Sequence, residues 1–370
     1  MRGREPLGRR VLENIILQLL PRVKTRRSHF DGAYARSLVV FTKGANPTFS
    51  YYVAERLRRL KSEIPIKIHN IDDKDLSTID PEGAFVIICR YLRHAQINWI
   101  KRHGARLAGV GLLIDDDVRN LVVRSDAGLL YRTRLIRFHL WALSRINSQL
   151  DIIWASTPAL ADTLADTGCF TTVLSPLPGI ECTTRDEVRS AERPLVISFQ
   201  ATSIHSAEHL FLRPIVSDIL SRYPEVVFEV SADSKNEKIW RDITLHQSRI
   251  RIRPTIGWTE FLETTRQESV DIALVPLVSN LTNRVRSDTK RIDVARLGAA
   301  AVFSDVEAYA RRRVIGEVLV QNNVENWISA IEGLITSPQR RAVARQATMD
   351  AVAKMRNETA SFPGILVAGG

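Results

Sequence analysis

The sequence predicts an α/β protein built from two Rossmann-like domains with parallel sheets. A chain of 370 residues is longer than one hydrophobic core usually fills, so two domains are expected. Short apolar runs that suit buried strands alternate with helical segments along most of the chain. Residues 271–305 show this pattern most clearly, because two apolar runs flank a loop and a helix, which is the repeating unit of a parallel sheet.

The composition is that of a soluble globular protein, with 45% hydrophobic and 25% charged residues. No run approaches the ~18 uncharged apolar residues that a transmembrane helix needs. The N-terminus lacks an apolar core followed by a small-residue cleavage site, so export is not expected. Three widely spaced cysteines without metal-ligand spacing indicate reduced thiols and a cytoplasmic protein. They are Cys89, Cys169 and Cys182.

The net charge of +11 is concentrated early in the chain. Segment 1–30 has only two acids, Glu5 and Glu13, and its basic residues are Arg2, Arg4, Arg9, Arg10, Arg22, Lys24, Arg26 and Arg27. The apolar run VLENIILQLL lies between the basic clusters, a pattern typical of helices on anionic membrane surfaces. The alternatives are a disordered leader or a helix packed on the first domain. Nucleic acid is not expected, because no helix-turn-helix, zinc or aromatic RNA-binding signature accompanies the charge.

The first domain is predicted over residues 31–178. Its strands are expected at 37–44, 65–72, 84–90, 106–117 and 151–157, and its helices at 49–61, 91–103 and 129–149, with another helix opening at Pro158. A G-x-G-x-x-G dinucleotide fingerprint is absent after the first strand.

Three adjacent acids, Asp115, Asp116 and Asp117, end the fourth strand. Ligands of α/β proteins bind at the carboxyl ends of strands, so these side chains are site candidates. They suit a divalent metal, or the orientation of an acceptor hydroxyl and stabilisation of positive charge on a sugar carbon, or simply the capping of the next helix.

A segment rich in proline and mixed charge, residues 179–194, is predicted as the interdomain linker. The second domain is expected over 195–340, with strands at 195–200, 226–232, 249–254, 271–277, 299–305 and 316–322. Residues 341–370 are expected to form a C-terminal helix and tail.

The helix within 271–305 is expected to be capped by Ser287 or Asp288 and to end near Gly298. Free N–H groups and the helix dipole favour an anion at such an N-terminus. Cations cluster there, at Arg284, Arg286 and Lys290.

The spacing of Arg286, Lys290 and Asp293 predicts that they share one helix face. Asp293 is an acceptor suited to a diol such as a ribose. The pattern therefore indicates a site for a phosphate-bearing sugar or nucleotide. The alternative is a solvated face with i, i+3 and i, i+4 charge pairs.

This stretch resembles the donor-binding segment of GT-B glycosyltransferases, especially the large retaining family that uses nucleotide-sugar donors, glycosyltransferase family four. A form common in bacterial members is D-I-G-L-A-P-L…N-R-x-K-S-D-I-K-x-x-E-Y-A-A-L-G-x-P-V-V-x-S-D. The matching residues are Asp271, Pro276, Leu277, Asn283, Arg284, Ser287, Asp288, Lys290, Ala295, Gly298, Val302, Ser304 and Asp305. Two departures are Asp293, where the family has glutamate, and the alanine that replaces proline after the glycine.

The resemblance implies a GT-B fold, two Rossmann-like domains facing across a cleft, and transfer of a sugar with retention and without a metal. It implies that the donor diphosphate contacts Arg284, Arg286, Ser287 and Lys290, that the ribose contacts Asp293, and that Asp116, Asp117, His205 and Lys290 serve catalysis. It implies acceptor-side roles for Lys43, Gly44 and Asn46. From the residues alone, His205 also reads as a solvated or capping group, and Gly44 as part of a turn.

The predicted function is therefore transfer of a sugar from a nucleotide-diphosphate donor to a saccharide or a polyprenyl- or other lipid-linked acceptor, in bacterial cell-surface or exopolysaccharide synthesis. The predicted location is the cytoplasm, with peripheral binding to the inner face of the membrane. The alternative is a non-catalytic two-domain sugar- or nucleotide-binding protein, or a degenerate transferase subunit, because the fold serves these equally well.

Overall fold

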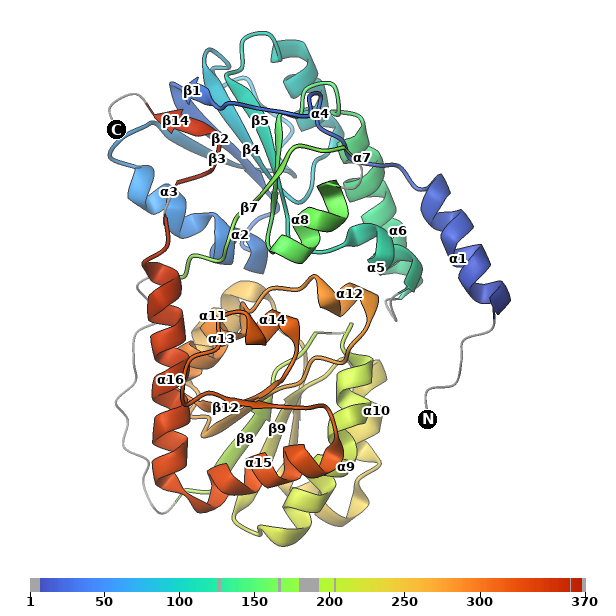
Figure 1. The fold of residues 1–370 in the computed structure, drawn as a ribbon, viewed down its shortest axis with the longest axis vertical. Coiled ribbons are helices and arrows are strands. Elements are labelled where there is room, and N and C mark those ends of the chain that lie inside the picture. The colour runs from blue at the N-terminus through green and yellow to red at the C-terminus, as the bar shows by residue number, and fades with distance from the viewer. Residues whose placement is uncertain are drawn as a thin grey trace. The chain divides into compact units, whose positions relative to one another are not determined.

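The computed structural model describes residues 7–124, 128–165, 168–179, 193–202, 204–359 and 361–367, with side chains from residue 11 onward. Most of the predicted linker, including Cys182, lies outside these residues. The chain forms two compact units (Figure 1). Unit 1 comprises Met1–Leu177, Val285–Ser287 and Thr359–Gly370, and unit 2 comprises Pro178–Arg284 and Asp288–Glu358.

Unit 1 contains a six-stranded parallel sheet in the order β3-β2-β4-β5-β6-β7. The strands are β2 (Ser37–Thr42), β3 (Ile66–Asn70), β4 (Ala84–Cys89), β5 (Gly109–Ile114), β6 (Ile152–Ala155) and β7 (Thr171–Val173). Strands β4, β5 and β6 are buried along their whole length, which explains why they read as continuous apolar runs. The strand order reverses between β2 and β4, so that point is the topological switch point of unit 1.

The helices of unit 1 are α1 (Leu7–Leu19), α2 (Pro47–Tyr52), α3 (Ala54–Leu60), α4 (His94–His103), α5 (Val118–Arg124), α6 (Leu129–Leu135), α7 (Trp141–Ser144) and α8 (Pro158–Ala165). A small parallel sheet joins β1 (Ala33–Ala35) to β14 (Ile365–Val367), so the last described strand pairs with the first one. No helix among the described residues is long and apolar enough to cross a membrane.

Three predicted helices of unit 1 differ in detail. The helix expected over 49–61 begins at Pro47, after an Asn46 cap, and is divided at Val53 into α2 and α3. The helix expected from residue 91 begins only at His94. The helix expected over 129–149 contains a π-helical turn, η1 (Ile136–Leu140), and ends at Ser144. Such turns have no sequence signature and often mark functional sites.

Unit 2 contains a second six-stranded parallel sheet, in the order β10-β9-β8-β11-β12-β13. The strands are β8 (Leu195–Phe199), β9 (Val226–Ser231), β10 (Ile250–Arg253), β11 (Ile272–Val275), β12 (Ala300–Ser304) and β13 (Val318–Val320). In chain order this is 3-2-1-4-5-6, the dinucleotide-binding order, with its switch point between β8 and β11.

The helices of unit 2 are α9 (Ser206–Arg222), α10 (Ser234–Arg241), α11 (Trp258–Gln267), α12 (Leu281–Arg284), α13 (Lys290–Leu297), α14 (Glu307–Ala310), α15 (Val324–Thr336) and α16 (Pro338–Arg356), with a 3-10 segment at Thr244–Arg249. Alternate residues of the strands enter two separate cores. One core includes side chains of α9, α10 and α15, and the other includes side chains of α13 and α14, so helices cover both faces of this sheet.

The predicted strand–loop–helix–strand unit is present as β11, α12, α13 and β12. Gly298 ends α13 in the left-handed conformation, with φ of 64°. Two expectations are wrong. Neither Ser287 nor Asp288 caps α13, whose N-cap is Thr289 and makes no side-chain capping bond. Arg286 therefore does not share a helix face with Lys290 and Asp293, because it precedes the helix.

Candidate functional site at two sheet edges

Parallel α/β sheets bind ligands beyond the carboxyl ends of their strands, at the point where the strand order reverses. In unit 2 that point lies after β8 and β11, and in unit 1 it lies after β2 and β4. A cluster of polar side chains lies at each of these two points.

Glu208 joins the two loops at the switch point of unit 2. It is 2% exposed, and its Oε1 accepts hydrogen bonds from the Val278 backbone N–H at 3.0 Å and from Asn283 Nδ2 at 3.0 Å. Its Oε2 lies 3.5 Å from His205 Nδ1. Burial pushes the pKa of Glu208 upward, but the bonds from His205 and the Val278 N–H outweigh this and lower the pKa. The loop after β8 is thereby tied to the loop after β11.

The first turn of α13 presents one cation and one carboxylate. Lys290 Nζ donates to Asp293 Oδ2 at 3.1 Å, and Arg296 Nη1 donates to Asp293 Oδ1 at 3.2 Å. Asp293 is 3% exposed, whereas the Lys290 side chain is 36% exposed. The i, i+3 charge pairs of the alternative interpretation are therefore present. Both carboxylate oxygens of Asp293 accept a hydrogen bond from a basic side chain of α13.

Two aromatic side chains of α11 lie beside these charges. The rings of Trp258 and Phe261 stack with centroids 5.4 Å apart. The Lys290 ammonium lies 6.0 Å from the Phe261 ring, and the Arg296 guanidinium lies 5.9 Å from the Trp258 ring. These cation–π contacts place a partly exposed aromatic surface next to Asp293.

A buried charge network fixes α13 in unit 2. The Arg291 side chain is fully buried and bonds Glu317 at 2.7 and 2.9 Å, Asp288 at 3.0 Å and the Tyr309 carbonyl at 2.7 Å. The carboxylates raise the pKa of Arg291, although burial alone would lower it. Asp288, which the sequence offered as a helix cap, thus acts as a partner of Arg291.

The segment between α12 and α13 belongs to unit 1. Ser287 Oγ lies 2.5 Å from the Tyr52 hydroxyl, and Thr157 Oγ1 donates to the Val285 carbonyl at 2.7 Å. Arg286 lies in this segment and Arg284 is exposed at the end of α12 in unit 2. The predicted diphosphate-binding residues therefore do not form one cluster on α13, and only Lys290 lies in that helix.

Arg90 is the centre of the cluster in unit 1. Its φ of 65° makes it the sole described residue other than glycine with a positive φ. Its guanidinium lies 3.0 Å from Asp115 and 3.2 Å from Asp116, and Thr48 Oγ1 donates to Asp115 at 2.6 Å. Burial raises the pKa of Asp115, and Asp116 adds to the rise, although Arg90 opposes it. Strained backbone and shared charge of this kind are typical of functional sites.

His139 holds the strained peptide of Arg90. Its Nδ1 lies 2.7 Å from the Arg90 carbonyl, and the residue is 2% exposed within the π-helical turn η1. Burial, with the charge of Arg90, lowers the pKa of His139 to about 3. The imidazole is therefore neutral at physiological pH, and its Nδ1–H donates to the carbonyl.

Asp117 has a different role from its two neighbours. Its Oδ1 accepts from the Asn120 backbone N–H at 3.1 Å and its Oδ2 accepts from Asn120 Nδ2 at 2.5 Å, so it caps α5. Asp115 and Asp116 thus share Arg90 as their partner, whereas Asp117 binds Asn120. Among the described residues, no group of three His, Cys, Asp or Glu is arranged to hold a metal ion.

The acceptor-side candidates form the turn between β2 and α2. Asn46 Oδ1 accepts from the Phe49 N–H at 2.9 Å, and its Nδ2 donates to Thr42 Oγ1 at 2.9 Å. Gly44 has a φ of 52°, which explains the choice of glycine. Lys43 is exposed beside them.

No protein-family model matches the sequence, and no curated protein matches it. Solved structures do match. Trehalose-6-phosphate synthase from Burkholderia multivorans superposes with a TM-score of 0.55 at 11% identity, covering 88% of this chain and 96% of that one. HepE of Anabaena in complex with UDP-glucose gives 0.54 at 11% identity, covering 86% and 97%. A proposed UDP-N-acetylglucosamine 2-epimerase from Listeria monocytogenes gives 0.50 at 10% identity, covering 87% and 95%.

These similarities confirm the predicted fold, in which two Rossmann-like domains form the GT-B architecture. They also show that this architecture is shared by proteins described as a synthase and as an epimerase. An activity must therefore be argued from the site.

Sequence reasoning missed Arg90, His139 and Glu208. Arg90 lies at the carboxyl end of a buried strand, and this position alone could have indicated a site residue. His139 lies in a segment read as an ordinary amphipathic helix. Glu208 is three residues after His205, and that spacing at the start of a helix was a usable sign of a pair.

Proposed function

We propose that the protein is a GT-B glycosyltransferase that moves a sugar from a nucleotide-diphosphate donor to an acceptor hydroxyl. The observation that carries the proposal is the Glu208 cluster, which joins His205 and Asn283 at the 3-2-1-4-5-6 switch point of unit 2. Nucleotides bind at this point in sheets of this order. The similarity to HepE, whose structure contains UDP-glucose, supports the same class of donor.

In this proposal, unit 2 holds the donor. Asp293 accepts the ribose hydroxyls, and the Trp258–Phe261 pair offers a surface for the base. Lys290 neutralises the charge that develops on the departing diphosphate, and electrostatic stabilisation of this kind is expected to contribute most to the rate. Arg284, at the end of α12 in the same unit, contributes a second cation to the diphosphate site. His205, positioned by Glu208, donates to the sugar or the phosphate.

Unit 1 receives the acceptor. Asp116 is partly exposed beside Arg90 and accepts a hydrogen bond from the attacking hydroxyl. Asp117 reaches this role only indirectly, by fixing the start of α5. Lys43, Gly44 and Asn46 shape the neighbouring loop. Transfer proceeds with retention and without a metal, to a saccharide or lipid-linked acceptor in cell-surface polysaccharide synthesis at the cytoplasmic side of the membrane.

A screen of UDP-, GDP- and dTDP-sugars by thermal shift tests the donor class. One nucleotide series should raise the melting temperature, because a ligand that binds only the folded state stabilises it by mass action. The stabilising donor is then incubated with a saccharide or polyprenyl-phosphate acceptor, and free nucleoside diphosphate is measured. Stabilisation without release would favour the non-catalytic binding protein, and no stabilisation by any series would contradict the proposal.

A matched pair of lysine variants localises the activity. Lys290→Ala should lower turnover by about 10- to 100-fold, the usual effect of losing one charge-stabilising donor. Lys238→Ala removes an exposed lysine from α10 in the same unit and should leave turnover unchanged. Full activity in Lys290→Ala would remove α13 from the mechanism.

A further inference from the structure

Helix α1 turns its apolar side to solvent. Five side chains spaced along one face are exposed, from 38% at Ile16 to 79% at Leu19. They are Val11, Leu12, Ile15, Ile16 and Leu19. We call this set the α1 stripe. A soluble helix normally buries such a face, so the stripe requires an apolar environment that unit 1 does not supply.

Polar contacts hold α1 on unit 1 from the opposite side. Arg124 Nη2 donates to Asn14 Oδ1 at 2.6 Å, and its Nε lies 3.4 Å from Glu13. Arg119 donates to the Leu17 carbonyl. The helix is therefore anchored to α5 by its polar residues, and its apolar face is displayed.

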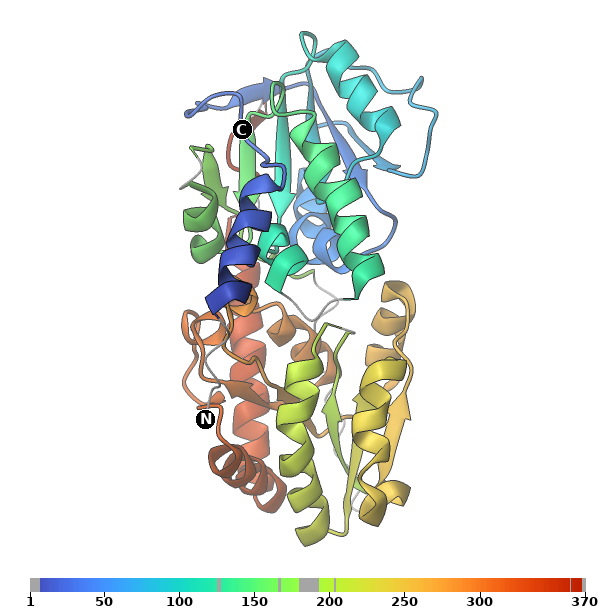
Figure 2. The same ribbon diagram turned by 90° about the vertical axis from the view of Figure 1, so that its right-hand side faces the viewer.

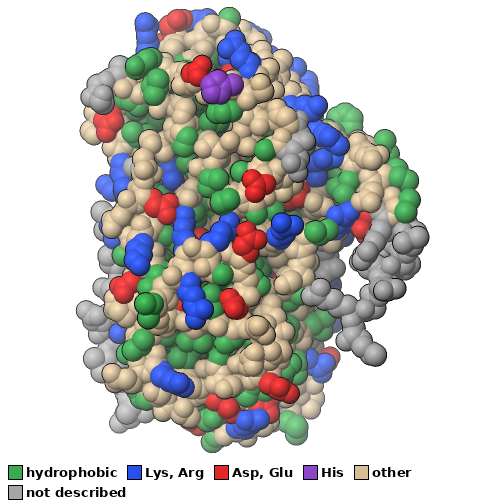
Figure 3. Space-filling view, in the orientation of Figure 1, with side chains coloured by type: hydrophobic (Ala, Val, Ile, Leu, Met, Phe, Trp, Pro, Cys, Tyr) green, Lys and Arg blue, Asp and Glu red, His purple; other side chains and the backbone are tan. Residues whose placement is uncertain are grey.

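The helical segment from α6 to α7 lies on the same side of unit 1, as Figure 2 shows. Residues 129–145 contain four arginines and no acid. Its exposed residues at helical spacing are Leu130, Arg134, Arg137, Trp141 and Arg145. We call these the arginine ridge. Arginine beside exposed tryptophan and leucine is typical of helices at a lipid–water interface. Figure 3 shows Lys and Arg side chains gathered at the edge of unit 1 where α7 lies.

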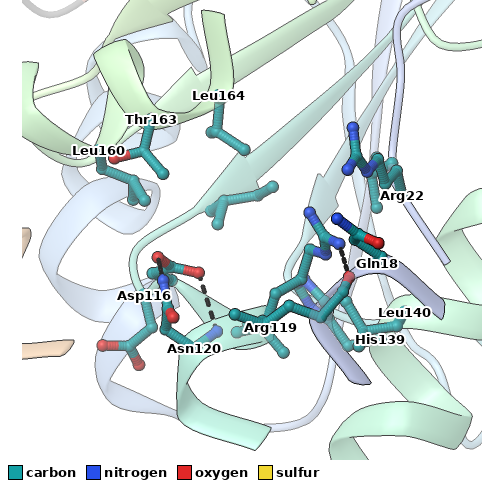
Figure 4. A pocket seen from close by; sticks show the side chains of 15 residues that line it. Gln18, Arg22, Asp116, Arg119, Asn120, His139, Leu140, Leu160, Thr163 and Leu164 are labelled. Atoms are coloured by element: carbon teal, nitrogen blue, oxygen red, sulfur yellow. Dashed lines mark hydrogen bonds between the residues drawn. The ribbon is translucent and has the colours of Figure 1, made fainter. Parts of the chain in front are cut away.

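A cavity of about 190 Å³ lies between α1, α5 and α8 (Figure 4). Arg22 and Arg119 line it, together with Leu160 and Leu164, and Asp116 reaches its far side. Burial lowers the pKa of Arg119 and the charge of Arg22 adds to this effect, whereas Asp117 opposes it. The carboxylates of Asp116 and Asp117 line the same cavity and offset the charges of the two arginines. The volume is below the ~300 Å³ of a typical small-molecule pocket, so the cavity suits part of a larger ligand.

We propose that this side of unit 1 docks on an anionic lipid bilayer, with the α1 stripe in the acyl region and the arginine ridge and the exposed Arg22 at the lipid phosphates. Because Asp116 lines the cavity beside α1, the bilayer would present a lipid-linked acceptor to the group proposed to bind its hydroxyl. This last step rests on the proposed function, whereas the docking itself does not.

Charge decides between a bilayer and a second copy of the chain. A two-fold dimer through this side would bring the arginine ridge of one copy against the same basic side of the other. An anionic surface instead complements the ridge and the exposed basic residues that follow α1, Arg22, Lys24 and Arg27. The bilayer therefore satisfies both the apolar stripe and the positive charge.

Co-sedimentation of the full chain with vesicles tests the docking. Binding is expected to phosphatidylcholine vesicles that contain phosphatidylglycerol, and it should weaken with added salt and be absent with phosphatidylcholine alone. Inorganic phosphate at matched concentration should not displace the protein from vesicles, which separates a lipid phosphate from a free one. Displacement by phosphate, or no binding to anionic vesicles, would overturn the proposal.

Two variants and one control locate the surface. Ile15→Glu with Leu19→Glu should weaken vesicle binding by about tenfold or more, because two charges enter the acyl region. Ile315→Glu changes an exposed apolar residue of unit 2 and should bind as the parent does. If light scattering shows that the parent is a dimer and the double variant a monomer, the stripe covers a second copy, and the proposal is wrong.

Arg22→Gln separates binding from folding. Removing one of two like charges should leave the melting temperature equal or higher, while binding to anionic vesicles falls about threefold to tenfold. Lower stability with unchanged binding would show that Arg22 is structural. Stabilisation by nucleotide sugars is measured on the same variants. If this stabilisation persists while vesicle binding is lost, the docking surface is confirmed independently of the donor site. If vesicle binding is normal but no nucleotide sugar stabilises the protein, the proposed function is wrong and the docking proposal still holds.

Discussion

The two switch points differ in how their charges are held. In unit 1, the side chain of Arg90 is only 14% exposed and lies between Asp115 and Asp116 on strained backbone, and neutral His139 fixes its carbonyl. In unit 2, Lys290 is only partly covered and pairs within its own helix. Removing a buried partner leaves an uncompensated charge, whereas removing an exposed partner leaves a solvated one. The ion pairs of Arg90 in unit 1 are therefore structural, whereas the ion pair of Lys290 in unit 2 is open to a ligand.

The largest effect is expected from Arg90→Met. The variant leaves two carboxylates close together without their cation, so unit 1 should lose about 3–5 kcal/mol of unfolding free energy. Denaturant unfolding followed by tryptophan fluorescence measures this. Arg58→Met is the matched control, because Arg58 is 56% exposed at the side chain and pairs with Glu55, so this substitution should lower stability far less. An equal loss of unfolding free energy in both variants would contradict the difference between the covered Arg90 pairs and an exposed ion pair.

The two buried histidines should make the unfolding free energy decrease at acid pH. His139 has a folded pKa of about 3 and an ordinary value of 6.5, so the unfolded chain takes up its proton first as the pH falls. Stability is therefore complete above about pH 6.5 and decreases below it, by about 2 kcal/mol near pH 5. In unit 2, the pKa of His209 is about 4, and it should act in the same direction.

His139→Gln and His209→Gln assign that acid sensitivity to the units. Each variant should flatten the pH dependence of unfolding between about pH 5 and 7 for its own unit. Denaturant midpoints across this range measure the effect. A pH profile that neither variant changes would place the sensitivity on other groups.

A smaller effect is expected at the aromatic pair of α11. Trp258→Ala should weaken binding of the nucleoside diphosphate that stabilises the protein by about tenfold, because stacking of the base is lost. Binding of inorganic pyrophosphate, which has no base, should not change. Trp141→Ala in unit 1 is the control. Loss of both ligands in Trp258→Ala would indicate collapse of the site rather than loss of stacking.

The sequence predicted the sheets well because buried parallel strands are apolar throughout, as in β4, β5 and β11. It missed β1, β7 and β14, which are three residues long and only partly buried. Lys290 and Asp293 share a helical turn, so spacing could bring them together. Arg90 and His139 are 49 residues apart and meet through tertiary packing, which no local pattern encodes.

Calorimetric titration of a nucleoside diphosphate into the parent, Lys290→Ala and Lys238→Ala tests the central claim most directly. The account predicts that Lys290→Ala weakens binding by about 10- to 100-fold, the value of a charged hydrogen bond, with little change in melting temperature. Lys238→Ala should bind as the parent does. Unchanged affinity in Lys290→Ala would contradict the assignment of the donor diphosphate to the first turn of α13.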